Sequence, residues 1–391
     1  MITRLELQNF TAFSDLAIDF SPRVNVIIGE NGTGKTHLLK AAYGLCSGGP
    51  LFKNKPDTSK GELEAALTAK LLRLFMPLDD KLGKMRRHGV AESAQVEARF
   101  ALDRKIAVTF HTNSRSLAIQ DSANYEQYQA EPVFIPTKEV LSLVNGMTDR
   151  SHDQRTVELI FDAGYVDLAE ALMRQGHDDP ETKINLDPRF GSVVPMLVNL
   201  IKGRYRWENG GFCFQSGTYE ETADPNRSKA KAAQMYQDST VTRFVPTKDP
   251  LFSSGMTAEG FRKVGILHRL LSNGTLNPGI SGPLFWDEPE SNMNPKLTKL
   301  LVEILLELSR NGQQIILATH DYVLLKWFDL LSAKGKEDHV RFHALFREDG
   351  SGEVRCESVD AYQQLNRNAI AATFSDLYDS ELDRSLGGQS K

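Results

Sequence analysis

The sequence predicts an α/β fold, with a mixed β-sheet, an antiparallel β-layer near the N-terminus and a helical insertion. Three observations support this prediction. A glycine-rich turn joins the β-branched run 24–28 to a helical pattern that starts near Lys35. In the C-terminal third, short apolar strands alternate with helical patterns, as in parallel sheets. The segments 2–20 and 96–119 alternate apolar and polar residues instead, which is typical of antiparallel strands with one solvated face.

The composition is that of an ordinary globular protein. The 46 Lys and Arg stand against 51 Asp and Glu, so the formal net charge of −5 excludes a wholly basic nucleic-acid-binding protein but not a local basic groove. No apolar run approaches the roughly 18 residues of a membrane span, and the alternating start is unlike a signal peptide. Three widely spaced cysteines favour neither a disulfide framework nor a zinc cluster. We therefore expect a reduced, cytoplasmic protein with no membrane partner.

The chain is predicted to form two lobes of one domain with an insertion between them. The N-terminal lobe is assigned to residues 1–140. Between 141 and 245 the pattern changes, because helical segments such as 156–174 surround a hairpin-like stretch with Asn209-Gly210 at its turn. The C-terminal lobe, residues 246–391, returns to alternating strands and helices and ends in a second hairpin pattern. We interpret the middle segment as a mainly helical insertion rather than an independent domain.

The segment 29–36 fits the phosphate-binding pattern G-x-x-x-x-G-K-[ST] completely. Glycines let consecutive backbone N–H groups turn toward a phosphate, and the following helix adds the positive end of its dipole. Lys35 would then reach the β- and γ-phosphates, and the Thr36 hydroxyl would bind Mg²⁺. The alternative is a chance glycine-rich turn, which a strand before and a helix after disfavour. The predicted nucleotide-binding set is Gly29, Glu30, Asn31, Gly32, Thr33, Gly34, Lys35, Thr36 and His37.

A second apolar strand, 284–286, delivers two adjacent carboxylates to a sheet edge. Asp287 is suited to hold Mg²⁺ beside a nucleotide. Glu288 can then polarise the attacking water, because a positioned carboxylate is a plausible general base. The alternative is an acidic helix N-terminus, where Asp and Glu are common. The phosphate-binding pattern upstream favours the catalytic interpretation.

A third apolar strand, 315–318, is followed by His320. An imidazole at the end of a neighbouring strand can donate a hydrogen bond to a γ-phosphate and so report its hydrolysis. A lone histidine after a strand is usually only a loop residue. Its position 32 residues beyond Glu288, with one helix between them, favours the sensing role. The predicted catalytic residues are therefore Lys35, Glu288 and His320.

These three elements, in this order, resemble the ABC-type ATPases that include SMC and RecF proteins. They are most similar to the compact AAA-15 and AAA-21 ATPases of bacterial anti-phage systems such as PARIS, Septu and the OLD nucleases. The resemblance is carried by "ITRLELQNFTAFSDLAIDFSPRVNVIIGENGTGKTHLLK" near the N-terminus and by "AEGFRKVGIL", "LFWDEPESNMNP" and "IILATHD" in the C-terminal third. It implies an ABC-type P-loop ATPase fold that binds ATP and Mg²⁺ and forms homo-oligomers, either dimers or assemblies of dimers.

In the resembled proteins, a signature segment from the opposite subunit completes each ATP site. The chain offers two candidates, Ser253–Met256 and Thr257–Gly260. We favour the second, because an amphipathic helix follows it directly and a helix N-terminus suits a γ-phosphate. A plain capped helix remains the alternative. The predicted contacts are Thr257, Ala258, Glu259 and Gly260.

The favoured segment departs from the Leu-Ser-Gly-Gly pattern of the family. Ala258 stands where the serine hydroxyl would lie, and Glu259 stands where a glycine would lie. The Glu259 carboxylate would oppose a phosphate unless it turns away or is neutralised by Arg262 or Lys263. This departure weakens the expectation of tight closure driven by ATP.

Four further segments bear on the site, and the last two of them have more than one interpretation. The resemblance places the interface loop called the D-loop at 291–294, whereas the loop after 133–135 lacks the glutamine expected there, so we assign no metal ligand to it. The basic run 81–87 suits nucleic-acid phosphates or, more simply, a solvated face. Phe10 and Phe13 suit either an adenine ring or the core.

The predicted function is an ATP-binding and ATP-hydrolysing switch. The resemblance implies the sensor ATPase of an anti-phage system that controls a separate effector nuclease or toxin, because an insertion of about 100 residues is too short for SMC-type coiled-coil arms. The nearest alternative is a RecF-like repair clamp on duplex DNA. A scaffold that binds ATP without hydrolysis also stays open. An autonomous nuclease is disfavoured, because no Asp-x-Asp follows His320.

Overall fold

The computed structural model describes residues 1–148, 154–176, 180–208, 210–223 and 240–385. At its centre is a mixed sheet in which neighbouring described strands are parallel except for the last pair, β14 and β15. This arrangement confirms the predicted mixed sheet. The strands in spatial order are β15 (Val354–Val359), β14 (Val340–Arg347), β3 (Val24–Gly29), β13 (Ile315–Ala318), β12 (Leu284–Asp287) and β7 (Val133–Ile135).

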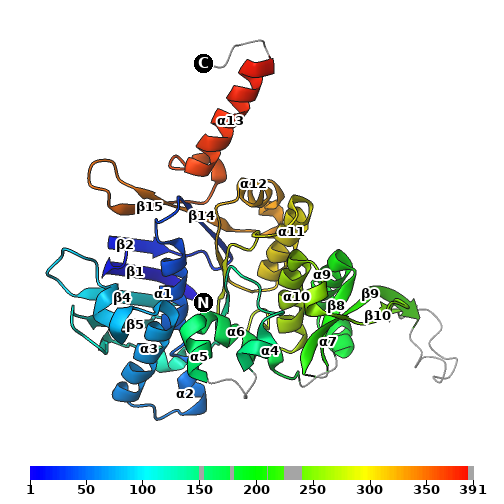
Figure 1. Cartoon of the computed structure of the whole chain (residues 1–391), viewed down its shortest axis with the longest axis horizontal. Helices are drawn as coiled ribbons and strands as arrows, with labels where there is room; N and C mark the ends of the chain where they lie inside the picture. The colour runs from blue at the N-terminus through cyan, green and yellow to red at the C-terminus, as the bar shows by residue number, and fades with distance from the viewer. Residues whose placement is uncertain (149–153, 177–179, 209, 224–239, 386–391) are drawn as a thin grey trace.

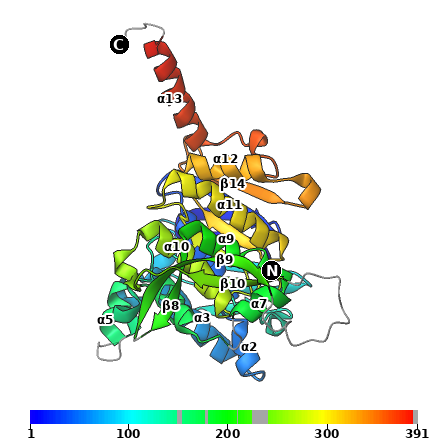
Figure 2. The same ribbon diagram turned by 90° about the vertical axis from the view of Figure 1, so that its right-hand side faces the viewer.

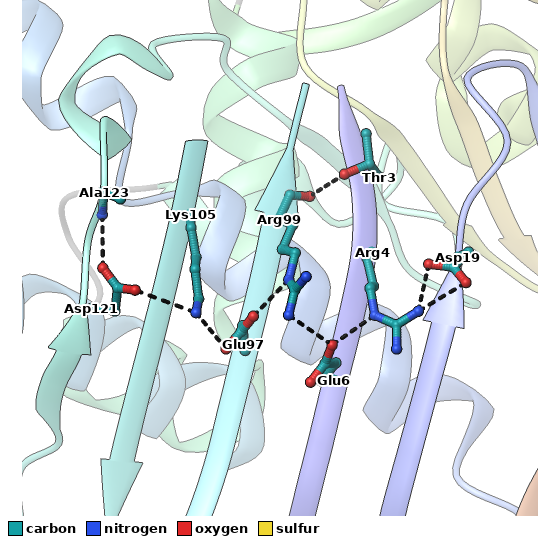
Figure 3. Close-up of polar contacts among 9 residues, drawn as sticks. All are labelled: Thr3, Arg4, Glu6, Asp19, Glu97, Arg99, Lys105, Asp121 and Ala123. Carbon is teal, nitrogen blue, oxygen red and sulfur yellow. Dashed lines mark hydrogen bonds and ion pairs between the residues drawn. The ribbon is translucent and has the colours of Figure 1, made fainter. Parts of the chain in front are cut away.

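The predicted antiparallel layer is a second sheet, with its strands in the order β2 (Phe13–Asp19), β1 (Ile2–Phe10), β4 (Ala94–Phe100), β5 (Arg104–Phe110) and β6 (Ala118–Asp121). One face of this sheet is buried, and the other carries a ladder of opposite charges (Figure 3). Arg4 contacts Glu6 at 2.6 Å, and Arg99 contacts the same carboxylate at 3.2 Å. The Arg99–Glu6 contact joins β4 to β1, and a cross-strand charge pair of this kind favours one register. The exposed face is therefore polar, and opposite charges on neighbouring strands lie next to each other.

The central sheet separates two hydrophobic cores. Along each parallel strand, successive buried side chains point to opposite faces. In β12, for example, Leu284 and Trp286 belong to one core, and Phe285 belongs to the other. This explains why strands that are apolar at every position were recognisable from sequence, since neither face of them meets water.

The helices fill these two cores (Figures 1 and 2). Helix α1 (Lys35–Cys46) contacts both sheets and α3 (Lys60–Phe75), and the short α2 (Pro50–Asn54) lies between them in sequence. The other core contains α10 (Glu259–Ser272), α11 (Pro295–Arg310) and α12 (Tyr322–Leu331). Helix α13 (Ala369–Ser385) projects away from the body in both views.

The segment between β7 and α10 holds short helices and a third sheet. In it, β9 (Gly211–Ala223) pairs with β8 (Gly203–Glu208), β10 (Thr240–Pro246) and β11 (Phe252–Ser253). The sequence indicated only the hairpin of β8 with the start of β9, and its turn residue Asn209 lies outside the described residues. The boundaries at 140 and 245 remain a prediction. The helices are α4 (Val144–Thr148), α5 (Gln154–Ile160), α6 (Ala163–Met173), α7 (Pro180–Leu186), α8 (Pro188–Gly191) and α9 (Val194–Ile201).

One long helix was expected over 156–174, but the chain forms α5 and α6 there. Asp162 lies between them, and its carboxylate accepts a hydrogen bond of 2.8 Å from the backbone N–H of Gly164. The first turn of a helix has free backbone N–H groups, and an N-cap side chain such as Asp162 accepts a hydrogen bond from one of them. A new helix therefore starts at this point. The apolar spacing continues across the break, which is why periodicity alone did not reveal it.

Gln314 joins the antiparallel sheet to the central sheet. Its buried amide accepts a hydrogen bond from the backbone N–H of Ile2 at 3.0 Å and donates to the carbonyl oxygens of Ile2 and Ser21 at 2.8 and 2.9 Å. Three backbone groups that would otherwise be buried without partners are thereby satisfied. The N-terminal strand is held against the same sheet that carries the candidate site.

Candidate nucleotide-binding site

The predicted phosphate-binding loop, residues 29–36, connects β3 to α1 at one edge of the central sheet. Gly29, Gly32 and Gly34 have φ angles of 153°, 79° and 93°, which favour glycine. A Cβ atom on Gly29 would lie 2.5 Å from the carbonyl oxygen of Leu345, and one on Gly34 would lie 2.6 Å from the Phe13 ring. At positions 29 and 34, glycine is therefore required by contact as well as by backbone conformation.

Phe10 and Phe13 are both fully buried. The Phe13 ring packs against Gly34, and Phe10 packs edge-to-face against Phe75 with ring centroids 5.4 Å apart. Of the two interpretations that the sequence left open, the structure supports core packing. Because both rings are buried, neither is exposed to stack on an adenine ring.

Lys35, the first residue of α1, crosses the loop. Its Nζ donates hydrogen bonds to the carbonyl oxygens of Gly29 at 2.6 Å and Glu30 at 3.1 Å. Burial lowers the pKa of Lys35, while the nearby carboxylates of Glu288 and Asp287 oppose that shift. The Lys35 ammonium group is thus held within the loop, close to the carboxylates at the end of β12.

Asp287 ends β12 and receives two hydroxyl hydrogen bonds on one carboxylate oxygen. Thr36 donates to its Oδ2 at 2.8 Å, and Thr137, in the loop after β7, donates to the same atom at 3.1 Å. Burial raises the pKa of Asp287, and the bond from Thr36 lowers it. Three segments far apart in the sequence therefore meet at this carboxylate.

Thr137 was missed from the sequence, where the loop after β7 was searched for a glutamine. A signal was present, because a hydroxyl residue lies two positions beyond a buried strand. What was lacking was the strand order, which places β7 directly beside β12. Lys138 and Glu139 follow Thr137, and Glu139 pairs with Arg262 at 2.9 Å instead of contributing to this cluster.

Glu288 follows β12 directly and has a left-handed backbone, with φ of 49°. Its backbone N–H donates to the carbonyl oxygen of Ala318 at 2.9 Å, which fixes it beside the end of β13. Its Oε1 lies 3.1 Å from Nδ1 of His320. The predicted base and the predicted sensor therefore face each other at the ends of adjacent strands, and both side chains retain access to solvent.

A cleft of about 690 Å³ opens beside the loop. Most of the predicted loop residues line it, and Glu288 lines it as well. The basic run 81–87 reaches the same cleft through Lys84 and Arg86, joined by His88. The sequence had suggested nucleic-acid phosphates or a solvated face for this run. The structure places two of its cations, Lys84 and Arg86, in the lining of the cleft beside the candidate site.

His37 lines this cleft next to Phe75, with the two ring centroids 5.5 Å apart. Burial lowers the pKa of His37, and Lys40 lowers it further. The imidazole is therefore neutral near pH 7, as befits a ring that packs rather than one that binds an anion by charge.

The predicted signature segment lies away from this cleft. Ala258 occupies the N-cap of α10 without a capping side chain, and Glu259 and Gly260 line a separate hollow of about 380 Å³ with Asn292 and Asn294 of the D-loop. The structure thus brings the signature and D-loop segments together but does not bring them to the phosphate-binding loop of the same chain. The other candidate is less suitable, because Ser254 is buried.

Neutralisation of Glu259 by Arg262 or Lys263 is not observed among the described residues. Glu259 accepts a hydrogen bond from the Asn292 side chain at 2.9 Å. Lys263 is buried and donates to the backbone oxygen of Glu288 at 3.2 Å and to the Ser291 hydroxyl. Lys263 therefore connects α10, which follows the predicted signature segment, to the acidic end of β12.

Glu290 is a buried carboxylate of this region that the sequence did not single out. Its Oε1 accepts a hydrogen bond of 2.7 Å from the Thr319 hydroxyl, and that hydroxyl accepts one of 2.9 Å from the backbone N–H of Asp321. Burial raises the pKa of Glu290 to about 6. It links the loops that carry Glu288 and His320. The sequence feature that could have revealed it is a third acidic residue in the run 287–290.

Residues 93–326 match the AAA_21 family, described as "AAA domain, putative AbiEii toxin, Type IV TA system". The chain belongs to this family. Residues 4–139 also match a second family of AAA domains, AAA_23. Together with the fold, these matches confirm the resemblance to ABC-type, SMC- and RecF-like P-loop ATPases. Proteins of this class use a nucleotide and usually Mg²⁺.

Curated relatives match only a short part of this AAA_21 protein. The DNA replication and repair protein RecF of Tropheryma whipplei (strain TW08/27) is 37% identical over 73 residues, which is 18% of this chain and 20% of that protein. RecF of Alkaliphilus oremlandii (strain OhILAs) is 39% identical over 57 residues, 15% of each chain. The chain thus spans about a fifth or less of the length of these two relatives.

Among solved structures, an SMC head bound to the C-terminal winged-helix domain of ScpA superposes with a TM-score of 0.50. The match covers 93% of this chain and 98% of that one, at 14% identity. This likeness confirms the fold of an ABC-type head. Within the described residues, no helix is both long and apolar enough to cross a membrane.

Proposed function

We propose that this AAA_21 protein is an ATP-hydrolysing switch of the ABC/SMC-like class. The observation that carries the proposal is the meeting of Thr36, Asp287 and Thr137 at one sheet edge, beside Lys35 and opposite the Glu288–His320 pair. Lys35, Thr36 and Glu288 line one cleft of about 690 Å³, and the Thr36 hydroxyl in that lining bonds to the Asp287 carboxylate. These are the parts that phosphoryl transfer to water requires.

The donor set fits Mg²⁺, which prefers oxygen ligands and keeps several waters beside one or two carboxylates and the substrate phosphates. Thr36 and Asp287 would hold the ion, because their 2.8 Å contact places the two oxygens side by side and Thr36 lines the cleft. Within the described residues no cluster of three Asp, Glu, His or Cys could hold a metal by itself, so phosphate and water would complete the site. The bound ion would offset charge on the β- and γ-phosphates.

The other residues have distinct proposed roles. The backbone of 29–36 cradles the phosphates, and Lys35 exchanges its carbonyl contacts for the β- and γ-oxygens. Glu288 accepts a proton from the attacking water. His320, held 3.1 Å from Glu288, reports the state of the γ-phosphate by hydrogen bonding.

We further propose that two copies of the chain form each complete site. In one copy the N-terminus of α10 faces a hollow shared with the D-loop, away from the phosphate-binding loop. A helix N-terminus favours a phosphate, so the segment 257–260 is suited to the γ-phosphate held by a second copy. Lys263 then couples this contact to Glu288 within its own chain.

The proposed process is anti-phage defence, in which the ATPase controls a separate effector nuclease or toxin. Two observations support it. The description of the AAA_21 family names an AbiEii toxin of a Type IV toxin–antitoxin system. Apart from α13, the helices run to at most 16 described residues, too short for long coiled-coil arms.

A RecF-like clamp on duplex DNA is the second candidate. It is favoured by the RecF matches and by the cations Lys84 and Arg86 at the cleft. A clamp should bind duplex DNA only with ATP, and its affinity should fall steeply with salt. Fluorescence anisotropy of a labelled duplex, titrated with salt in the presence and absence of ATP, distinguishes the two. ATP-independent or absent binding argues against the clamp.

The proposed chemistry is tested by Glu288→Gln, which keeps the shape of the side chain but cannot accept a proton. We expect steady-state phosphate release to fall at least about 100-fold, the usual contribution of a general base. Nucleotide affinity, measured by equilibrium dialysis, should stay within about twofold. The exposed Glu126→Gln serves as the control. Turnover of Glu288→Gln at the wild-type rate would show that another group is the base.

A further inference from the structure

A second hollow, of about 440 Å³, lies outside the candidate ATP site. It is bordered by β8, which pairs only with β9 among the described strands, and by the C-terminal half of α10. Its volume is within the usual range of small-molecule sites. The side chains that matter most for its chemistry are Arg204, Arg206, Trp207, His268, Arg269 and Ser272.

The hollow is positively charged. Arg204, Arg206 and Arg269 line it, and none of its described lining residues is acidic. Arg206 pairs with Glu208 at 2.9 Å. Within the described part of the chain, the other two guanidinium groups donate only to neutral oxygens: Arg204 to the Gln215 amide at 3.2 Å, and Arg269 to two backbone carbonyls, each at 2.9 Å. Among the described residues, neither of these two positive charges has a carboxylate partner.

His268 adds a buried polar group without a full set of partners. The side chain is 3% exposed, and its Nε2 lies 3.3 Å from the Ser272 hydroxyl. Its Nδ1 has no hydrogen-bond partner among the described residues. Burial lowers the pKa of His268 to about 3, with Arg204 and Arg269 adding to the shift. A buried nitrogen left unpaired is costly, so a ligand atom that bonds to it would be favoured.

Aromatic groups complete the lining. Trp207 is half-buried at the hollow, and Tyr205 and Tyr219 are buried beneath it. Arginine forks match phosphate oxygens well, and indole or phenol rings stack on bases of any sequence. A simple carboxylate or sulfate would use the arginines but not the rings.

We propose that this hollow binds a phosphorylated nucleoside, with Arg204 and Arg269 at its phosphate, Trp207 at its base and His268 at a polar edge. Two sources supply that chemistry, a free nucleotide and the 5′-phosphorylated end of a single strand. The site lies on the same helix, α10, whose other end carries the segment 257–260. It is separate from the cleft lined by Lys35, so its existence does not depend on ATP hydrolysis.

The test uses the full chain carrying Lys35→Ala, which weakens the ATP site, and isothermal titration calorimetry with AMP, inorganic phosphate and a 5′-phosphorylated oligothymidylate of six nucleotides. We expect saturable binding of AMP or of the oligonucleotide, with phosphate alone at least tenfold weaker. Tighter AMP assigns a free nucleotide, and a tighter oligonucleotide assigns a strand end. No binding of either at millimolar concentration, or phosphate as tight as both, would overturn the proposal.

Substitutions locate the binding. Arg204→Gln and Trp207→Ala should each reduce affinity at least tenfold, because the first removes a proposed contact to the phosphate and the second removes the proposed contact to the base. Arg243→Gln, on the same sheet but outside the hollow, should leave it unchanged. Arg206→Ala provides a second, more exposed test if Arg204→Gln lowers the melting temperature. Binding that survives both Arg204→Gln and Trp207→Ala would exclude this hollow as the site.

Discussion

Glu290 illustrates how much a single buried group can influence this protein. It is 8% exposed, one carboxylate oxygen bonds to Thr319, and the other has no partner among the described residues. Burial disfavours its charged form and raises its pKa to about 6. Because Thr319 precedes His320, the charge on this one carboxyl group bears on the position of the proposed sensor.

The raised pKa of Glu290 means that its contribution to the stability of the fold decreases as the pH rises. The folded chain holds the Glu290 proton more tightly than the unfolded chain, whose value is 4.5. The contribution of this group to the free energy of unfolding is therefore fully present below pH 4.5 and is lost as the pH rises through about 6. In Glu290→Gln that loss is absent. Relative to wild type, the unfolding free energy of the variant should rise by about 2 kcal/mol between pH 4.5 and 7.

Urea unfolding at several pH values measures this difference, and the exposed Glu126→Gln should show no such trend. A difference between Glu290→Gln and wild type that stays constant with pH would mean that Glu290 is not the titrating group.

At the scale of elements, close packing between α10 and β8 depends on one glycine. A Cβ atom on Gly265 would lie 2.2 Å from the ring of Tyr205. That ring is fully buried, and its hydroxyl lies 2.7 Å from the Thr257 hydroxyl, so it has little freedom to move. The contact joins the predicted insertion to the helix that begins at the signature segment.

We therefore expect Gly265→Ala to destabilise the protein. Alanine favours a helix interior by about 1 kcal/mol, but overpacking a core typically costs about 1–3 kcal/mol, so the clash should outweigh the gain. Gly61→Ala in α3 is the matched control, because an added Cβ meets no described residue within 4 Å. This substitution should stabilise the protein by up to about 1 kcal/mol. Equilibrium denaturation of both variants gives the comparison. Equal stabilisation by both would contradict the packing argument.

Some strands and helices could be predicted from their own sequences, and others could not. The strands β3, β12 and β13 were recognisable because each is a short, mostly apolar run that is buried throughout and is followed by glycine or polar residues. Strand β10 was not recognised, since its pairing partner is the distant second half of β9. The break between α5 and α6 depended on one side-chain cap at Asp162. Local patterns predict local structure well, whereas sheet pairing is a contact between distant segments.

At the scale of the whole molecule, the proposed dimer should form only when ATP is bound and not hydrolysed. Glu288→Gln with ATP and Mg²⁺ should sediment as a dimer, and Lys35→Ala as a monomer, in analytical ultracentrifugation. In the Glu288→Gln background, Ala258→Glu should abolish the dimer, because it adds a carboxylate where the partner's γ-phosphate would approach. Ala258→Ser, which restores the family's hydroxyl, should strengthen it.

Gly255→Glu is the control for this experiment, because position 255 belongs to the other signature candidate and is exposed. A Cβ atom added there would meet no described residue within 4 Å. Loss of the dimer with Gly255→Glu but not with Ala258→Glu would transfer the signature role to the segment 253–256. A dimer that forms equally without ATP would exclude nucleotide-driven assembly.

The sequence by itself determined the phosphate-binding loop, the carboxylates after β12 and the histidine after β13, because each follows from a short run of neighbouring residues. Only the tertiary structure revealed that Thr137 bonds to Asp287, that Glu290 links two loops, that Lys263 reaches Glu288 and that Lys84 and Arg86 border the cleft. These contacts depend on strand order and helix packing. They are set by burial of residues far apart along the chain, which no local pattern encodes.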